Sequence, residues 1–321
     1  MSAMRRLLFS AAAIATTAGA GFAQTDWPDR PVNVIIGASP GGDTDFNART
    51  FARYFEQVTG VSMVITNMPG GGATIATTAV RDAEPDGATV LFGHTGHLIV
   101  TEVSGLADYG IDDFEICCIP AVDQGAVFVT SEQSGIASVD DLLEQTTADP
   151  DAVIYGTEFG GYSHLQGLLF MEQTGAQMRL VDTGSAAEKI ASLLGGRIQV
   201  AGIAYGAVQD YHEAGQMSVL GQPNAERNPL LGDIPTFTEQ GVDFVMNNPY
   251  IIAFPKGTDE AIVERMAEIS AEISQIPEYA TDLEQGFRQP VLSYGHEESL
   301  ELLHAIRDNY MQHGDALQSS R

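Results

Sequence analysis

The chain has 321 residues, of which 44% are hydrophobic and 18% are charged, and its formal net charge at pH 7 is −28. This length and apolar content allow about two globular domains. The negative charge disfavours nucleic acid and anionic membranes as partners, because both repel the chain at long range.

Residues 1–23 have the pattern of a secretory signal peptide. A pair of arginines precedes an apolar run at residues 7–18, and small residues lead to a cleavage site after Ala23. A membrane-anchoring helix is the less favoured alternative, because the run is shorter than the ~20 residues that a membrane span needs. We therefore predict a periplasmic mature chain that starts near Gln24.

The first half of the mature chain has a β-α-β-α-β order. Buried strands are expected at residues 32–36, 61–65 and 89–92, with one helix that Asp43 or Thr44 caps and Gly60 ends, and a second at 74–82. This order predicts a parallel sheet with right-handed crossovers. The carboxyl ends of the strands then share one edge, where open α/β sheets bind ligands.

Two glycine-rich turns follow the first two strands. They are residues 39–45 (SPGGDTD) and 67–72 (NMPGGG). Glycines allow positive φ and a close approach of the backbone, and a helix that starts after such a turn points unpaired N–H groups at a ligand. Two such turns facing each other predict a pincer for an anion.

His94 and His97 follow the third strand at the same edge of the sheet. They could be interpreted as metal ligands, but no carboxylate or third histidine stands at a useful spacing. Ligand contact or simple packing of the loop is favoured, and we expect no metal and no cofactor.

Cys117 and Cys118 are the only cysteines and are adjacent. A disulfide between neighbouring residues is strained and rare. Two buried thiols and an unusual redox pair both stay open, whereas the number and spacing of the cysteines exclude a cysteine-based zinc site.

The second half of the chain contains a further series of strands and helices. Strands are expected at 126–130, 153–155, 178–181, 198–201, 218–220 and 251–254, and helices after Ser138 and at 165–172, 186–194, 208–214, 261–276 and 300–311. Two such series predict an α/β clamshell of two lobes, each an open, mostly parallel sheet flanked by helices. We place lobe one at 26–128 and 243–321 and lobe two at 129–242.

Five segments, in this order, carry a resemblance to a known family. They are residues 27–31, 40–49 (PGGxTDxxAR), 67–72 (NxPGxG), 85–87 (PDG) and 234–241 (IPTFxEQG). With them the chain resembles the Bug or TctC family, the periplasmic solute-binding proteins of tripartite tricarboxylate transporters. The resemblance implies a type 2 periplasmic-binding-protein fold and, as partners, the membrane subunits of such a transporter.

The resemblance also implies which residues bind the ligand. Family members hold one carboxylate through backbone N–H groups and ordered waters of the first two turns. By position, the residues of these turns are Ser39, Gly41, Gly42, Asp43, Thr44, Pro69, Gly70, Gly71, Gly72 and Ala73. Further candidates are His94 and, in the second lobe, Gly160, Gly161, Ser163, Thr183 and Gly184.

Asp43 stands where the family usually has a small residue. A carboxylate beside the pincer costs an anionic ligand on the order of a kilocalorie per mole or more, unless it points away as a helix cap. Capping and ligand contact therefore both stay open. The candidate ligands are small carboxylates, namely di- or tricarboxylates, amino acids or hydroxy acids. Asp43 and the loss of the family's Pro-Tyr-Lys-Gly at 181–184 disfavour a citrate-like trianion.

Enzyme motifs do not fit the chain. The first turn lacks the lysine of a phosphate loop and the spacing of a dinucleotide-binding turn. Ser163 and His164 are neighbours and do not face each other on a helix. We expect a monomeric binding protein that delivers its ligand to a transporter. A protein of the same fold that presents its closed form to a membrane receptor is the alternative.

Overall fold

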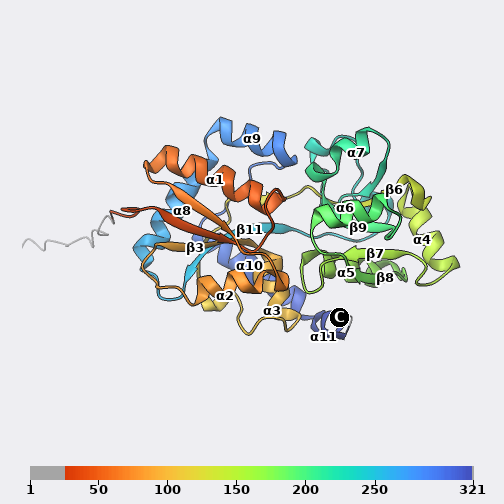
Figure 1. Cartoon of the computed structure of the whole chain (residues 1–321), viewed down its shortest axis with the longest axis horizontal. Coiled ribbons are helices and arrows are strands. Elements are labelled where there is room, and N and C mark those ends of the chain that lie inside the picture. Colours follow the sequence, from red (N-terminus) through yellow and green to blue (C-terminus); the bar gives the residue numbers. More distant parts are fainter. Residues whose placement is uncertain (1–25, 320–321) are drawn as a thin grey trace, which may run out of the picture.

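The structure of the protein, a computed structural model, describes residues 26–319. The predicted signal peptide at residues 1–23 lies outside this range. Two sheets, each flanked by helices, form two lobes that lie side by side along the long axis of the molecule (Figure 1). Of the helices in this range, none has the length and apolar character of a membrane span.

The first lobe is built around a sheet with the order β2-β1-β3-β11-β4. Its strands are β1 (Val32–Ile36), β2 (Met63–Asn67), β3 (Thr89–His94), β4 (Phe114–Cys118) and β11 (Asn248–Pro255), with β5 (Val122–Asp123) paired to β11. Its helices are α1 (Asp43–Thr59), α2 (Thr74–Arg81), α3 (Thr101–Val103), α8 (Glu260–Ser274), α9 (Pro277–Phe287) and α10 (His296–Met311). As predicted, β1, β2 and β3 are parallel, whereas β11 enters antiparallel to β3 and β4.

The second lobe is built around a sheet with the order β10-β6-β9-β7-β8. Its strands are β6 (Ala126–Ser131), β7 (Ile154–Thr157), β8 (Arg179–Asp182), β9 (Val200–Ala204) and β10 (Met217–Gly221). Its helices are α4 (Val139–Ala148), α5 (Tyr162–Thr174), α6 (Ala186–Leu194) and α7 (Gln209–Glu213). Strands β7, β8 and β9 are parallel, and β6 and β10 are antiparallel additions, so this sheet is also mixed.

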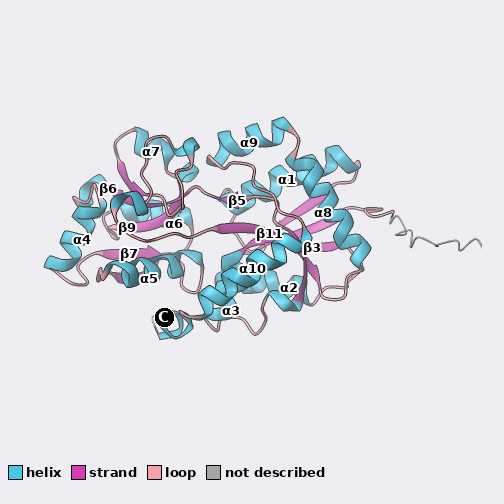
Figure 2. Cartoon of the chain, turned by 180° about the vertical axis from the view of Figure 1, so that it is seen from behind, coloured by secondary structure: helices cyan, strands magenta, loops and turns pink. Residues whose placement is uncertain are grey.

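The chain passes between the lobes at least twice. It leaves the first sheet after β5 and joins the second at β6, and it returns between β10 and β11 (Figure 2). The predicted lobe ranges of 26–128 with 243–321 and of 129–242 stay predictions. Since β6 pairs along its length in the second sheet, the pairing favours a first crossing at Gln124 and Gly125. The last helix, α11 (Gly314–Ser319), contacts α5 of the second lobe.

Strand β4 and helix α9 are not among the elements expected from the sequence. In β4, Glu115 interrupts a short apolar run, which weakens the strand signal. In α9, the buried residues Tyr279, Leu283 and Phe287 recur every four positions, which is a helical signal present in the sequence. The two-lobed α/β fold itself is confirmed.

The adjacent cysteines are free thiols buried in the core of the first lobe. Their sulfur atoms lie 3.0 Å apart, and Cys117 Sγ lies 3.5 Å from the carbonyl oxygen of Val263 in α8. Burial raises the pKa of the Cys117 thiol well above its ordinary value, so the thiol stays protonated. Of the alternatives left open, the structure has two buried thiols.

An aromatic cluster fills the core of the second lobe. Phe128 of β6 lies at its centre and is fully buried. Ring centroids lie 4.9 Å from Phe128 for Phe170, 5.1 Å for Phe237, 5.4 Å for Tyr155 and 5.7 Å for Phe244. These rings join β6, β7 and α5 to the segment that leads back toward the first lobe.

Replacing Phe128 with Ala should destabilise the protein by about 3–5 kcal/mol, because the truncation leaves a cavity that the surrounding rings cannot fill. Urea unfolding followed by circular dichroism measures the change. Val64→Ala on the exposed edge strand β2 is the control and should cost less than about 1 kcal/mol. Equal losses in the two variants would contradict a packed aromatic core.

Candidate functional site

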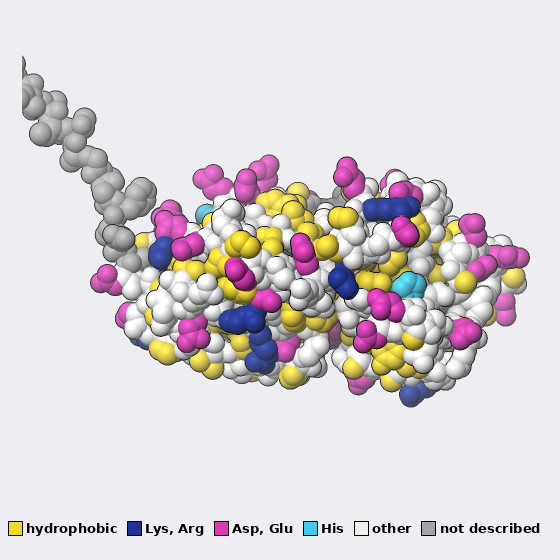
Figure 3. All heavy atoms as spheres, turned by 90° about the horizontal axis from the view of Figure 1, so that it is seen from above, with side chains coloured by type: hydrophobic (Ala, Val, Ile, Leu, Met, Phe, Trp, Pro, Cys, Tyr) yellow, Lys and Arg dark blue, Asp and Glu magenta, His cyan; other side chains and the backbone are white. Residues whose placement is uncertain are grey.

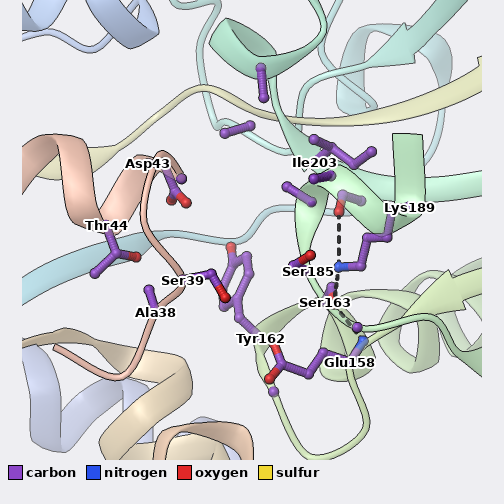
Figure 4. A pocket seen from close by; sticks show the side chains of 18 of the residues that line it. Ala38, Ser39, Asp43, Thr44, Glu158, Tyr162, Ser163, Ser185, Lys189 and Ile203 are labelled. Atoms are coloured by element: carbon purple, nitrogen blue, oxygen red, sulfur yellow. Dashed lines mark hydrogen bonds between the residues drawn. The ribbon is translucent and has the colours of Figure 1, made fainter. Parts of the chain in front are cut away.

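A cleft of about 630 Å³ lies between the two lobes and is lined by both. Most of the predicted site residues line it: Ser39, Gly41, Gly42, Asp43, Thr44, Pro69, Gly70, Gly72, His94, Gly161, Ser163 and Gly184. Lining residues that the sequence analysis does not name include Asp123, Glu158, Tyr162, Gln166, Lys189 and Asn248. In Figure 4, Ser39 and Asp43 on the first-lobe turn face Ser163, Ser185 and Lys189 of the second lobe.

The remaining predicted residues lie outside the lining: Gly71, Ala73, Gly160 and Thr183. Ala73 packs closely against Gly37, which lies just before the first turn. A Cβ atom added to Gly37 would lie only 2.1 Å from the Cβ of Ala73. Gly160 packs on the first lobe, because a Cβ there would lie 1.9 Å from Leu106 Cδ1. The Thr183 hydroxyl donates to the carbonyl oxygen of Val181 at 3.3 Å. These residues shape or support the turns.

The first turn places the N-terminus of α1 at the cleft. Gly41 adopts positive φ, and Gly42 is the N-cap residue and offers no side chain to the helix. The first N–H groups of an α-helix have no acceptor within the helix. The N–H groups at the start of α1 therefore lie beside the cleft without a side-chain cap, where an anion can accept hydrogen bonds from them.

A buried carboxylate ties the first turn to the second. Asp45 is 4% exposed and accepts hydrogen bonds from the Gly41 N–H, Arg49 Nε and Asn67 Nδ2, each at 2.9 Å. Asn67 also donates to the carbonyl oxygen of Ala38 at 2.9 Å. Arg49 is thereby paired with Asp45 and Asn67 and is not part of the cleft lining.

Asp43 does not cap α1. The helix begins at Asp43 itself, and Asp43 Oδ2 accepts a hydrogen bond from the Tyr250 hydroxyl at 2.9 Å. Gln289 Nε2 donates to the same hydroxyl at 3.2 Å, and Asn47 Nδ2 bridges Gln289 Oε1 and the Asp43 carbonyl oxygen at 2.8 Å each. This network comes from β11 and from the segment after α9, so local sequence around Asp43 could not show it.

Asp123 is a second carboxylate on the first-lobe wall and is 5% exposed. Its Oδ1 accepts hydrogen bonds from the Gly125 N–H at 2.7 Å and from Gln289 Nε2 at 3.4 Å. Burial, reinforced by the negative charge of Asp43, raises the pKa of Asp123 to about 7. Asp123 and Asp43 together make this wall acidic.

His94 and His97 lie against each other at the end of β3, with ring centroids 3.8 Å apart. His94 Nδ1 accepts a hydrogen bond from the Gly96 N–H at 3.0 Å, and burial lowers the pKa of His94 to about 4. Burial also lowers the pKa of His97 well below its ordinary value, so both rings are neutral near pH 7. Within residues 26–319, no group of three or more His, Cys, Asp or Glu side chains is arranged to hold a metal ion.

The second-lobe wall contains a buried lysine. Lys189 of α6 is 6% exposed, and its Nζ donates to Ser163 Oγ at 2.8 Å and lies 3.5 Å from the carbonyl oxygen of Gly202 (Figure 4). Burial lowers the pKa of Lys189 to about 8, opposed by the negative charge of Glu158. The sequence carried a signal for it, because Lys189 stands four residues before buried Leu193 on the inner face of α6.

Acidic side chains are scattered over both lobes on the face seen in Figure 3, with fewer basic ones between them. The attraction that holds an anionic ligand must therefore be local to the cleft, since distant surface charge repels it.

The Asp123→Asn variant should have a pH-dependent advantage in stability. In the wild type the pKa of Asp123 rises from 3.8 to about 7 on folding, so the stability that protonated Asp123 contributes is present below about pH 4 and is lost as the pH rises through about 7. Asparagine stays neutral and keeps the acceptor for the Gly125 N–H.

Differential scanning calorimetry should give similar melting temperatures for wild type and Asp123→Asn at about pH 4, and a variant several degrees more stable at about pH 8. A difference in melting temperature that stays constant between these pH values would contradict the raised pKa.

Comparison with known proteins places the chain among extracytoplasmic binding proteins. Residues 47–318 match the family described as the tripartite tricarboxylate transporter family receptor. Protein BugT of Bordetella pertussis is 28% identical over 266 residues, which cover 81% of this chain and 82% of BugT.

Two solved structures with bound ligands have similar folds. Rpa4515 of R. palustris, solved with adipate, superposes with a TM-score of 0.81 at 25% identity, covering 92% of this chain and 98% of that chain. MatC of Rhodopseudomonas palustris, solved with bound malate, superposes with a TM-score of 0.76 at 20% identity, covering 92% of this chain and 99% of MatC. The predicted clamshell of a periplasmic binding protein is thereby confirmed.

Proposed function

The chain belongs to the family of tripartite tricarboxylate transporter receptors, which are periplasmic solute-binding proteins and not enzymes, and we propose that it captures a small carboxylate in the cleft between its lobes. It then delivers this ligand, as a monomer without a cofactor, to the membrane subunits of a tripartite tricarboxylate transporter. Such delivery requires that the ligand be held by both lobes, because a membrane partner must distinguish the closed form from the open one.

The observation that carries the proposal is the uncapped N-terminus of α1 beside the cleft. Gly42 at the N-cap leaves backbone N–H groups without a side-chain acceptor, and the glycine-rich turn at 69–72 lines the cleft next to it. Backbone donors and the helix dipole suit a carboxylate. We assign the first carboxylate to Ser39, Gly41, Gly42, Thr44, Gly70 and Gly72, and the rest of the ligand to the opposite wall with Gly161, Ser163 and Gly184.

The ligands of structural neighbours support the chemical class. Adipate is bound by one neighbour and malate by another, and both are dicarboxylates. The proposal is tested by calorimetric titration of the purified protein with a panel of small mono-, di- and tricarboxylates. Binding of at least one member with a defined stoichiometry supports carboxylate capture, and failure of the whole panel would refute it.

Gly42→Val should weaken carboxylate binding by at least about tenfold with little effect on folding. Gly42 has negative φ, and a Cβ there would meet only the Ser39 carbonyl oxygen, at 3.7 Å, so the fold has room for the side chain. The added methyl groups would occupy the space in front of the α1 N–H groups. Isothermal titration calorimetry measures the affinity.

Gly295→Val is the matched control, because Gly295 is also an N-cap glycine with extended backbone and open space around its Cβ, but it lies on α10 outside the cleft. Both variants should change the melting temperature to a similar extent, and only Gly42→Val should lose affinity. Equal affinity in all three proteins would show that the N-terminus of α1 does not hold the ligand.

The exported protein should lack residues 1–23 and begin near Gln24, because its leader has the charge, apolar run and small-residue site of a signal peptide. Intact-mass spectrometry of protein recovered from the periplasm checks this. A mass that retains residues 1–23 would contradict both cleavage and the proposed location of the mature chain.

A further inference from the structure

We propose that Lys189, Ser163 and Gln166 form a second anion subsite on the second-lobe wall, which makes Lys189 the residue that selects ligands with two anionic groups. The inference rests on the proposed function, because it takes the first carboxylate to lie at the first-lobe turns. The ligand is then a small dicarboxylate, or a small carboxylate that has another acidic group in place of the second carboxylate.

The Lys189 ammonium has no carboxylate bonded to it. Among the described residues that line the cleft, it is the sole lysine or arginine. Lys256 on the surface forms an ion pair with Glu115, whereas Nζ of Lys189 has only neutral oxygens as hydrogen-bond partners in residues 26–319. A buried ammonium without a bonded counter-ion is costly, so an anion that reaches it gains a strong, charge-assisted hydrogen bond.

An unused hydrogen-bond donor lies on the same wall as the lysine. Gln166 is 1% exposed and lines the cleft, and its Nε2 has no hydrogen-bond partner in the described structure. Its Oε1 accepts a hydrogen bond from the Tyr155 hydroxyl at 3.4 Å. A buried N–H without an acceptor costs free energy that a ligand oxygen can recover.

The three side chains belong to one surface. Ser163 and Gln166 are three residues apart on α5 and share a helix face, and Lys189 reaches Ser163 from α6. Ser163 Oγ also lies 3.0 Å from Thr157 Oγ1 and accepts from the Glu158 N–H at 3.2 Å, which fixes its position. The wall therefore presents donors that are held in place before a ligand arrives.

The charges across the cleft place the second anionic group at this wall. Asp43 and Asp123 make the first-lobe wall acidic, so a second anion near them is repelled. Glu158 and Glu188 also line the cleft. Glu158 forms no ion pair with Lys189 and burial raises its pKa, and the Glu188 carboxylate accepts hydrogen bonds from the N–H and hydroxyl of Ser185. A ligand anchored at the α1 N-terminus and at Lys189 would bridge the lobes.

Matched ligand pairs test the inference. Succinate, glutarate and adipate are titrated against butyrate, valerate and hexanoate, in which a methyl group replaces one carboxylate. The wild type should bind at least one dicarboxylate about tenfold or more tightly than its partner. Lys189→Met keeps the unbranched stem without the charge and should abolish that preference, with monocarboxylate affinity changed by no more than about twofold.

Two further variants separate recognition from folding. Lys256→Met removes a surface lysine and should leave both affinities unchanged. Gln166→Met should weaken dicarboxylate binding several-fold and spare monocarboxylates. Melting temperatures of all variants show whether they fold, and loss of the buried charge in Lys189→Met should not lower stability.

The outcomes distinguish this inference from the proposed function. If the wild type binds monocarboxylates and dicarboxylates equally, or if Lys189→Met keeps the preference or weakens both classes alike, the second subsite is refuted while carboxylate capture stands. If the wild type binds neither member of any pair, the second subsite is refuted as well, and the proposed function fails with it only when the wider carboxylate panel is not bound either.

Discussion

The arrangement of the cleft depends on one buried carboxylate. Asp45 accepts hydrogen bonds from the Gly41 N–H in the first turn and from Asn67 at the start of the second, so it fixes the two turns relative to each other. It also pairs with Arg49, which takes the nearest arginine away from the ligand. The Asp45 carboxylate accepts the hydrogen bond of the Gly41 N–H, and no side chain caps α1. The N–H groups at the start of α1 are therefore left for an anion.

The two walls of the cleft differ in charge, and each wall comes from a different sheet. Asp43 and Asp123 lie on the first-lobe side, held by Tyr250 and Gln289, whereas Lys189 lies on the second-lobe side. A ligand that contacts both walls adds a link between lobes that already touch where α11 contacts α5 and Gly160 packs against Leu106. A ligand that bridges the walls in this way would favour an arrangement in which the lobes are close together.

The crossings between the lobes also form part of the cleft. Asp123 in β5, Ala126 at the start of β6 and Asn248 at the start of β11 all line it, next to the points where the chain changes sheets. Asn248 Oδ1 accepts a hydrogen bond from the Thr95 hydroxyl, which ties the return crossing to the loop after β3. A ligand in the cleft would therefore lie against the segments that connect the two lobes.

The sequence by itself determined the α/β order, the parallel β1, β2 and β3, and the two glycine-rich turns, because these follow from local apolar periodicity and from residues that permit unusual φ. It also pointed to Asp43 but not to its partner, since Tyr250 lies 207 residues away along the chain. Only the tertiary structure decided that Asp123, Gln166 and Lys189 face the cleft. Helical spacing marks Lys189 as an inward-facing residue, but the chemistry of all three side chains comes from burial and from neighbours on other elements, which no local pattern encodes.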